Sequence, residues 1–172
     1  MEANFCRRCG AKLTNQTGNY FVCDTGHPIY YNANPAVAVL LINDDYKVLT
    51  VIRKYDPGKG KLDLPGGFCD KGETFEATVA REIKEELDLN HKDYGPLQYL
   101  MSGIDPYPYK NETVIVIGAM FWSKIKSSAI IKPGDDVSDA RFLSFDEVDK
   151  KQFQFASQIA ALEKLHAISI LH

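Results

Sequence analysis

Apolar residues recur along this chain with two different periods, and each period predicts a different kind of element. One apolar residue in every four, from residue 75 to residue 87, is typical of an amphipathic helix. This stripe consists of Phe75, Val79, Ile83 and Leu87. Residues 154–170 repeat the helical pattern. Short runs rich in β-branched, aromatic or other apolar residues predict strands at residues 19–22, 35–42, 47–53, 97–102, 113–124 and 140–145.

The segments between these runs carry turn residues. Residues 43–45, Asn-Asp-Asp, join two of the strands in a predicted hairpin. The prolines within residues 102–109 predict a stiff loop, and the apolar run at 114–117 predicts a strand covered on both faces. A short helix is expected from Asp146. Strands flanked by two longer helices predict an α/β fold, specifically a three-layer α/β/α sandwich.

The first helix carries many carboxylates beside its apolar stripe. Glu82, Glu85 and Glu86 stand at positions i, i+3 and i+4, so they share one arc and repel one another. Partial burial would increase that repulsion or raise a pKa. Mg²⁺ or Mn²⁺ would remove the difficulty because both ions prefer oxygen ligands. From these residues alone, an ordinary solvated acidic face stays open as the alternative.

A glycine loop precedes this helix. Gly66 and Gly67 follow Pro65, and glycine permits positive φ and close approach of the backbone to another group. Glu73 or Thr74 is expected to cap the helix. A tight loop followed by a carboxylate-rich helix favours the metal-binding interpretation over the solvated face.

The spacing of these residues resembles the Nudix box. That motif is a glycine, five residues, Glu, seven residues, Arg-Glu, an aliphatic, any residue, Glu-Glu, any residue, glycine and an aliphatic. The matching residues are Gly67, Glu73, Arg81, Glu82, Ile83, Glu85, Glu86 and Leu89. Asp88 stands where the family usually has glycine, a departure that concerns the end of the helix rather than a metal ligand.

The resemblance implies a Nudix fold with a mixed sheet, and metal-dependent hydrolysis of a pyrophosphate bond. The catalytic set that it implies is Glu82, Glu85, Glu86, Glu73 and Arg81. Mg²⁺ or Mn²⁺ would bind the first three and the backbone carbonyl of Gly67, and Gly66 and Gly67 would lie against the substrate. Arg81 would pair with Glu73, either to hold the loop or as an ordinary surface ion pair. The general base would be a box glutamate or a later acidic residue, with Glu112 and Asp136 as loop candidates.

The N-terminal segment has a different composition. Cys6, Cys9, Cys23 and His27 form a Cys₃His set suited to tetrahedral zinc. The segment resembles the zinc ribbon that precedes some Nudix domains, although those ribbons have a cysteine where Gly26 stands here. We therefore expect a structural zinc ribbon at residues 1–34 and a Nudix hydrolase domain at residues 35–172. A decayed ribbon with three free thiols is the alternative.

Residues 102–109 resemble, in part, the signature S-Q-P-W-P-F-P of NADH pyrophosphatases. Ser102, Pro106 and Pro108 match it, and Tyr107 replaces the phenylalanine. Tyr107 and Tyr109 would then bind a purine, or would simply pack on the sheet. The favoured substrates are NADH and ADP-ribose, with release of AMP. Hydrolysis of a damaged nucleoside triphosphate or a capped RNA end, and a non-catalytic nucleotide sensor, stay open.

Net charge and the length of apolar runs limit the kinds of binding partner that we expect. A net charge of −3 and a pI of about 5.8 give no reason to expect general nucleic-acid binding. The longest apolar run, residues 36–42, is too short to cross a membrane, and the first residues do not resemble a signal peptide. We expect a cytoplasmic protein that takes a small nucleotide substrate. A homodimer is an expectation from the family alone.

Overall fold

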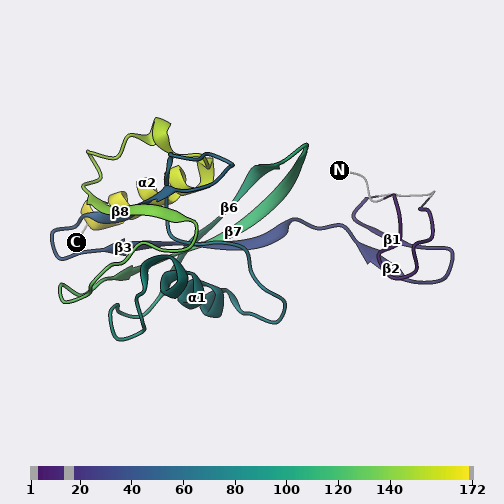
Figure 1. Cartoon of the computed structure of the whole chain (residues 1–172), viewed down its shortest axis with the longest axis horizontal. Coiled ribbons are helices and arrows are strands. Elements are labelled where there is room, and N and C mark those ends of the chain that lie inside the picture. Colours follow the sequence, from purple (N-terminus) through teal and green to yellow (C-terminus); the bar gives the residue numbers. More distant parts are fainter. Residues whose placement is uncertain (1–3, 14–17, 171–172) are drawn as a thin grey trace.

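The computed structural model describes residues 4–13 and 18–170, which form two units joined by the short segment 31–33 (Figure 1). The larger unit has a six-stranded sheet between α1 (Phe75–Leu87) and α2 (Ala156–Ile170). Its strands are β3 (Asn34–Ile42), β4 (Val48–Arg53), β5 (Leu62–Asp63), β6 (Gln98–Tyr109), β7 (Glu112–Lys124) and β8 (Val137–Leu143). A 3-10 helix, η1 (Lys150–Gln152), precedes α2. Among the described residues, no helix has the length and apolarity needed to cross a membrane.

The predicted α/β/α sandwich with a mixed sheet is confirmed. The strand order is β5-β4-β3-β7-β6, and β8 pairs with β4. Strands β3 and β7 are parallel over their full shared length, from Asn34↔Val116 to Ile42↔Lys124, and the other pairs are antiparallel. Figure 1 shows α1 and α2 on opposite sides of this sheet.

Alternate residues of β3 supply the two halves of the core. The side facing α1 includes Val37, Val39, Leu41, Val79, Ile83 and Leu87, and the side facing α2 includes Ala38, Leu40, Ile42, Leu162 and Leu165. Because successive side chains of a strand point to opposite faces, a strand covered on both faces must be apolar throughout. The predicted stripe on α1 is confirmed from Val79 onward. It was wrong for Phe75, which lies in the first turn and is 41% exposed.

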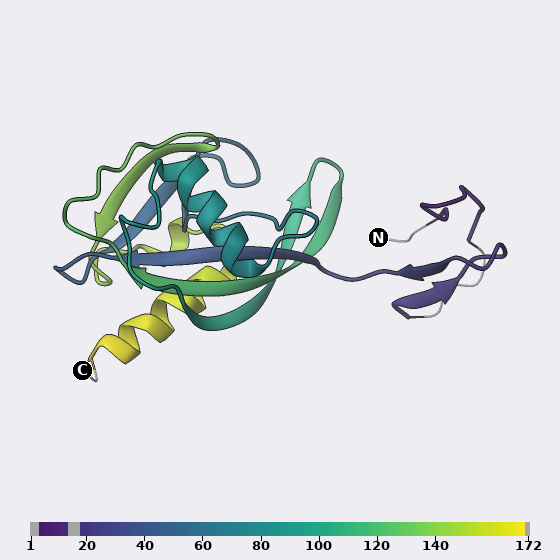
Figure 2. The ribbon, with the colours of Figure 1, turned by 90° about the horizontal axis from the view of Figure 1, so that it is seen from below.

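The β6–β7 hairpin corrects two predictions. Residues 102–109 are not a loop, because β6 continues to Tyr109 and pairs with β7 as far as Tyr109↔Glu112. The prolines are tolerated there because β6 is an edge strand, where a missing N–H costs no ladder bond. Residues 114–117 are not covered on both faces, and Ile115 and Ile117 are 47% and 41% exposed. Figures 1 and 2 show the reason: the hairpin extends beyond both helices.

Two turns show how local hydrogen bonds set the ends of elements. Asn43 closes the predicted β3–β4 hairpin by accepting from the N–H groups of Asp45 and Lys47 at 3.1 and 2.9 Å. The helix predicted from Asp146 is instead a turn. Ser144 and Glu147 cap each other there, with Ser144 N–H donating to the Glu147 carboxylate at 2.8 Å, and helical structure begins only at Lys150.

The N-terminal unit is small. It contains the antiparallel strands β1 (Tyr20–Val22) and β2 (Pro28–Tyr30). Its buried cluster consists of Cys6, Leu13, Cys23 and Ile29. So small a core among the described residues contributes little stability, and a metal or another cross-link would add to it.

Candidate active site

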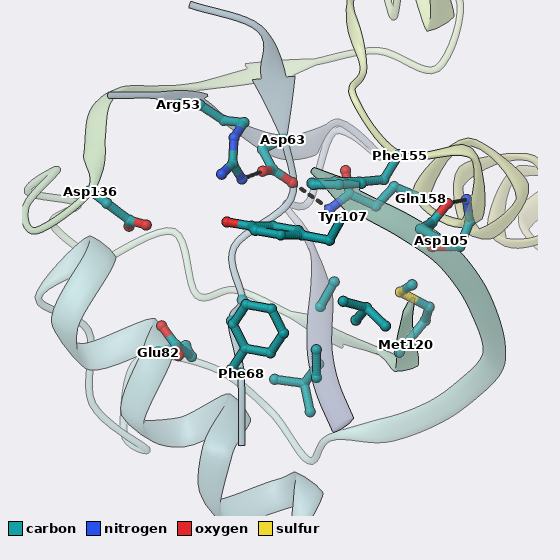
Figure 3. Close-up of a pocket in the computed structure, with 18 of the residues that line it drawn as sticks. Arg53, Asp63, Phe68, Glu82, Asp105, Tyr107, Met120, Asp136, Phe155 and Gln158 are labelled. Atoms are coloured by element: carbon teal, nitrogen blue, oxygen red, sulfur yellow. Dashed lines mark hydrogen bonds and ion pairs between the residues drawn. The ribbon is translucent and has the colours of Figure 1, made fainter. Parts of the chain in front are cut away.

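A cavity of about 310 Å³ lies between α1, the sheet and the start of α2 (Figure 3). It brings together six of the residues predicted from the sequence: Gly66, Gly67, Arg81, Glu82, Glu85 and Tyr107. The remaining three of the main-domain set, Glu73, Glu86 and Tyr109, are not part of its lining. Two of these three support lining residues, as described below.

The diglycine loop runs along β3 as if it were a short additional strand. Val37 N–H donates to the Gly67 carbonyl at 2.9 Å, and Val39 N–H donates to the Pro65 carbonyl at 2.8 Å. Gly66 has a φ of 150°, and a Cβ there would collide with the backbone of Val37. A Cβ on Gly67 would collide with the Glu82 carboxylate. The backbone collision makes glycine necessary at residue 66, whereas a Cβ at residue 67 would require the Glu82 side chain to move; the Gly67 carbonyl keeps one lone pair for a cation.

Two of the three helix carboxylates are buried. Glu82 is 8% and Glu86 4% exposed, whereas the Glu85 side chain is 44% exposed. Burial raises the pKa of Glu86 well above its ordinary value, and the carboxylate of Asp136 raises it further. Burial likewise raises the pKa of Glu82. Glu86 has one hydrogen-bond donor among the described residues, the N–H of Gly66 at 2.9 Å. Uncompensated negative charge at this depth is what a divalent cation would neutralise.

Arg81 connects the helix to the loop. Its guanidinium donates to Glu73 at 2.9 and 3.1 Å, to Glu82 at 2.8 Å and to Glu85 at 2.9 Å. It also donates to the Phe68 carbonyl at 2.9 Å. This geometry confirms the predicted Arg81–Glu73 pair. Because the N–H donors of Arg81 already bind other groups of the protein, this side chain orients the carboxylates and is not available to bind a phosphate.

One of the two loop candidates for the general base lies at the site. Asp136 lines the cavity, and its carboxylate is close enough to raise the pKa of both Glu82 and Glu86. Glu112 lies at the start of β7, at the tip of the hairpin, and does not line the cavity. The long hairpin places it away from α1.

Aromatic side chains form one wall. Tyr107 stacks on Phe155 with ring centroids 5.7 Å apart, and Phe68 meets the edge of Tyr107 at 5.3 Å. Phe68 and Tyr107 also line a second cavity of about 380 Å³, which includes Tyr109. The two tyrosines predicted to bind substrate therefore differ in position: Tyr107 lines both cavities, whereas Tyr109 lines only the second.

Comparison with known proteins identifies the family. Residues 33–162 match the NUDIX domain. The chain belongs to the Nudix family. It is 38% identical over 121 residues to the ADP-ribose pyrophosphatase of Methanocaldococcus jannaschii, covering 70% of this chain and 68% of that protein. It is 32% identical over 153 residues to the human mitochondrial NAD(P)H pyrophosphatase NUDT13, covering 84% of this chain but only 39% of that protein.

A solved structure supports the fold. The NUDIX hydrolase from Nitrosomonas europaea superposes with a TM-score of 0.67 at 20% identity, covering 95% of this chain and 88% of that one. The NUDIX domain match and the pyrophosphatase relatives support a Nudix pyrophosphohydrolase.

The ends of the Nudix helix explain the departure at Asp88. Thr74 caps the start, accepting from Ala77 N–H at 3.2 Å. Asp88 ends the helix with φ 56° and ψ 25°, and its N–H donates to the Lys84 carbonyl at 3.1 Å. Aspartate is one of the few residues other than glycine that enters this left-handed region at modest cost. The substitution therefore preserves the cap and leaves Glu82, Glu85 and Glu86 in place.

Glu73 supports the Nudix loop through charge, which makes its contribution pH-dependent. Arg81, with the N–H of Asp70, lowers the pKa of Glu73 from 4.5 to about 2. A carboxylate with a depressed pKa stabilises the fold above its unfolded pKa and loses that effect as the pH falls. We expect urea-unfolding midpoints of wild type to fall between pH 4.5 and about 2 more steeply than those of Glu73→Gln. Parallel curves for the two proteins would contradict this role.

The predicted zinc ligands converge in the N-terminal unit. The ligand atoms of Cys6, Cys9, Cys23 and His27 all lie within 4.8 Å of one another. The sulfurs of Cys9 and Cys23 are 3.9 Å apart, and His27 Nδ1 is 3.8 Å from Cys6 and 3.6 Å from Cys23. A tetrahedral site with zinc–sulfur bonds of about 2.3 Å has edges of roughly 3.8 Å. The donor set and its spacing therefore fit zinc.

The Thr25 hydroxyl lies 3.1 Å from the sulfurs of Cys9 and Cys23. This contact lowers the pKa of Cys9 and lowers that of Cys23 to about 6. Thiolates are the form in which cysteine binds metals, so the lowered pKa values suit a metal centre.

Several cavity residues were not anticipated from the sequence. They are Arg53, Asp63, Asp105, Phe155, Ser157 and Gln158. They come from β4, β5, β6, the residue before α2 and the first turn of α2, so no local motif joins them. One signal was present: Asp63 is a charged residue directly after an apolar position and directly before Leu64-Pro65, where a buried strand enters the loop.

Proposed function

We propose that this Nudix domain hydrolyses the pyrophosphate bond of a nucleoside diphosphate joined to a second group, with NADH and ADP-ribose favoured and AMP released. The observation that carries the proposal is the pair of buried carboxylates beside the diglycine loop: Glu82 lines the cavity, and Glu86 accepts a hydrogen bond from the N–H of Gly66, another lining residue. A diphosphate can approach that negative surface only with a cation between them. The names of the archaeal and human relatives support this substrate class.

The side chains divide into ligands and supports. Glu82, Glu85, Glu86 and the Gly67 carbonyl would hold Mg²⁺ or Mn²⁺, which supplies charge neutralisation for the phosphate oxygens and makes water more acidic. Arg81 keeps two of these carboxylates oriented through its hydrogen bonds to them. The burial of Glu82 and Glu86 excludes bulk water and strengthens every electrostatic interaction at that end of the cavity.

We assign the general base to Asp136. It lines the cavity (Figure 3) and, unlike Glu112, lies within electrostatic range of the buried pair. Its carboxylate would accept the proton that the attacking water loses.

The N-terminal unit has a separate role in this proposal. We propose that residues 1–34 form a structural zinc ribbon held by Cys6, Cys9, Cys23 and His27, and that residues 35–172 form the hydrolase domain. The convergence of the four ligand atoms supports the ribbon.

A substrate panel tests the catalytic proposal. With Mg²⁺ or Mn²⁺, purified protein should release AMP from NADH or ADP-ribose, measured by chromatography, and turnover should stop when the metal is chelated. Nucleoside triphosphates and a capped RNA serve as comparison substrates. Turnover confined to these, or none on any substrate while ADP-ribose still binds, would overturn the proposal, the latter in favour of a nucleotide sensor.

A further inference from the structure

Gln158 carries a hydrogen-bond acceptor that the rest of the protein does not use. The residue is 7% exposed and lines the cavity. Within residues 4–13 and 18–170, its Oε1 is the one buried side-chain polar atom without a hydrogen-bond partner. Buried acceptors are nearly always paired, so an unpaired one beside a ligand cavity calls for a partner from outside the chain.

Asp63 fixes which end of the Gln158 amide is left over. Gln158 Nε2 donates to Asp63 Oδ1, Leu64 N–H donates to the same oxygen at 2.8 Å, and Arg53 donates to Oδ2. An ionised carboxylate only accepts, so the amide must turn its NH₂ group toward Asp63. The reversed amide would place two acceptors against each other. The Gln158 carbonyl is therefore fixed as an acceptor and cannot rotate to become a donor.

These residues stand apart from the proposed metal ligands. Figure 3 shows Arg53, Asp63 and Gln158 on one side of the Tyr107 ring, with Glu82 on the other. A diphosphate bound at Glu82 would thus direct one of its two attached groups toward this wall.

We propose that Gln158, held in one orientation by Asp63, selects substrates that present an N–H donor to its carbonyl oxygen. The inference rests on the proposed function and names the chemistry that the same site selects: an amino group on a purine or a primary carboxamide, in preference to the corresponding oxo group or carboxylate. An oxo or carboxylate oxygen would meet the Gln158 carbonyl acceptor to acceptor, leaving both unpaired. Because Oε1 is shielded in the structure, the side chains that cover it must shift when the donor arrives.

A purely structural role for Gln158 leads to a different expected result. If the amide served only to hold Asp63, its loss would affect all substrates alike. Discrimination between paired substrates is therefore the readout, rather than activity itself.

The experiment compares kcat/KM for two substrate pairs. One pair is ADP-ribose and its hypoxanthine counterpart, which tests the purine amino group. The other is NADH and its nicotinate counterpart, which tests the carboxamide. The proteins are wild type, Gln158→Met and a control, Gln152→Met, whose exposed amide lies outside the cavity.

We expect wild type and Gln152→Met to prefer the N–H-bearing member of at least one pair by roughly tenfold or more. Gln158→Met should bring that ratio close to one. Asp63→Asn, which frees the amide to rotate, should also lower it. Equal ratios in wild type and Gln158→Met for both pairs, or a uniform loss on all substrates, would overturn the proposal.

A binding measurement separates this proposal from the proposed function. Calorimetric titration of AMP and IMP, and of the reduced nicotinamide and nicotinate mononucleotides, compares the same groups without requiring turnover. The protein could hydrolyse no substrate and still bind the N–H-bearing member more tightly only when Gln158 is present. In that case the hydrolase assignment would fail, but the proposed selection by Gln158 would stand. Equal affinities within both pairs would overturn the proposed selection by Gln158, whether or not the protein is active.

Discussion

Replacing Glu86 with glutamine should lower kcat/KM on the preferred diphosphate substrate by at least about a hundredfold. Glu86 is the most deeply buried of the three helix glutamates. It is 4% exposed, and its Oε2 accepts a hydrogen bond from the Gly66 N–H at 2.9 Å. The amide keeps the shape and an acceptor oxygen but removes the charge that would hold the cation. Because a divalent cation contributes several kcal/mol to stabilising the charge of the transition state, its loss affects kcat rather than only KM.

The same substitution should stabilise the protein when metal is chelated. Burial and the neighbouring Asp136 raise the pKa of Glu86, so its ionised form at neutral pH is disfavoured in the folded state. Removing the charge relieves that penalty. Urea unfolding in the presence of a chelator should therefore give a higher midpoint for Glu86→Gln than for wild type. Opposite effects on activity and metal-free stability are typical of a functional site that carries unfavourable charge.

Glu76→Gln is the matched control. It makes the same chemical change in the first turn of the same helix, on an exposed side chain outside the cavity. It should change kcat/KM by less than about twofold and stability by a few tenths of a kcal/mol. If Glu86→Gln retained wild-type kcat with saturating Mg²⁺, the buried carboxylate would be structural and the proposed metal site would have to be abandoned.

The sequence was sufficient for the Nudix helix and loop because their chemistry is local. The period of four predicts the buried face from Val79 to Leu87, and the glycine at residue 66 reflects a backbone collision that any Cβ would cause. The Arg81–Glu73 pair also follows from one motif. The sequence failed where neighbours decide the outcome: whether residues 102–109 form a loop or a strand depends on β7, which lies beyond a turn.

The far wall of the cavity could not be predicted for the same physical reason. Arg53, Asp63 and Gln158 meet through the folding of β4, β5 and α2 onto one another, and Asp63 and Gln158 are 95 positions apart in the sequence. No periodicity or short spacing signals such a contact. A buried aspartate can be suspected from a strand pattern, but its partners are visible only in three dimensions.

The second large effect concerns the N-terminal unit: Cys23→Ser should abolish its metal binding and unfold it while sparing the hydrolase domain. Cys23 is 5% exposed and belongs both to the four-ligand cluster and to the small core with Leu13 and Ile29. A structural zinc site contributes about 10–16 kcal/mol of binding free energy, far more than a core of this size can supply. Losing one thiolate therefore removes most of what holds residues 18–31 in place.

Elemental analysis should find about one zinc per wild-type chain, as expected for one Cys₃His site, and much less in Cys23→Ser. Hydrogen exchange should show lost protection in β1 and β2 but unchanged protection in α1 and α2, since the two units have separate buried clusters. The fourth cysteine gives the control: Cys69 lies outside the cluster, so Cys69→Ser should keep its zinc. If Cys23→Ser kept both metal and protection, or if wild type contained no metal and β1 and β2 were still protected, the four side chains would not be a zinc site. The N-terminal unit would then depend on contacts other than a metal for its stability.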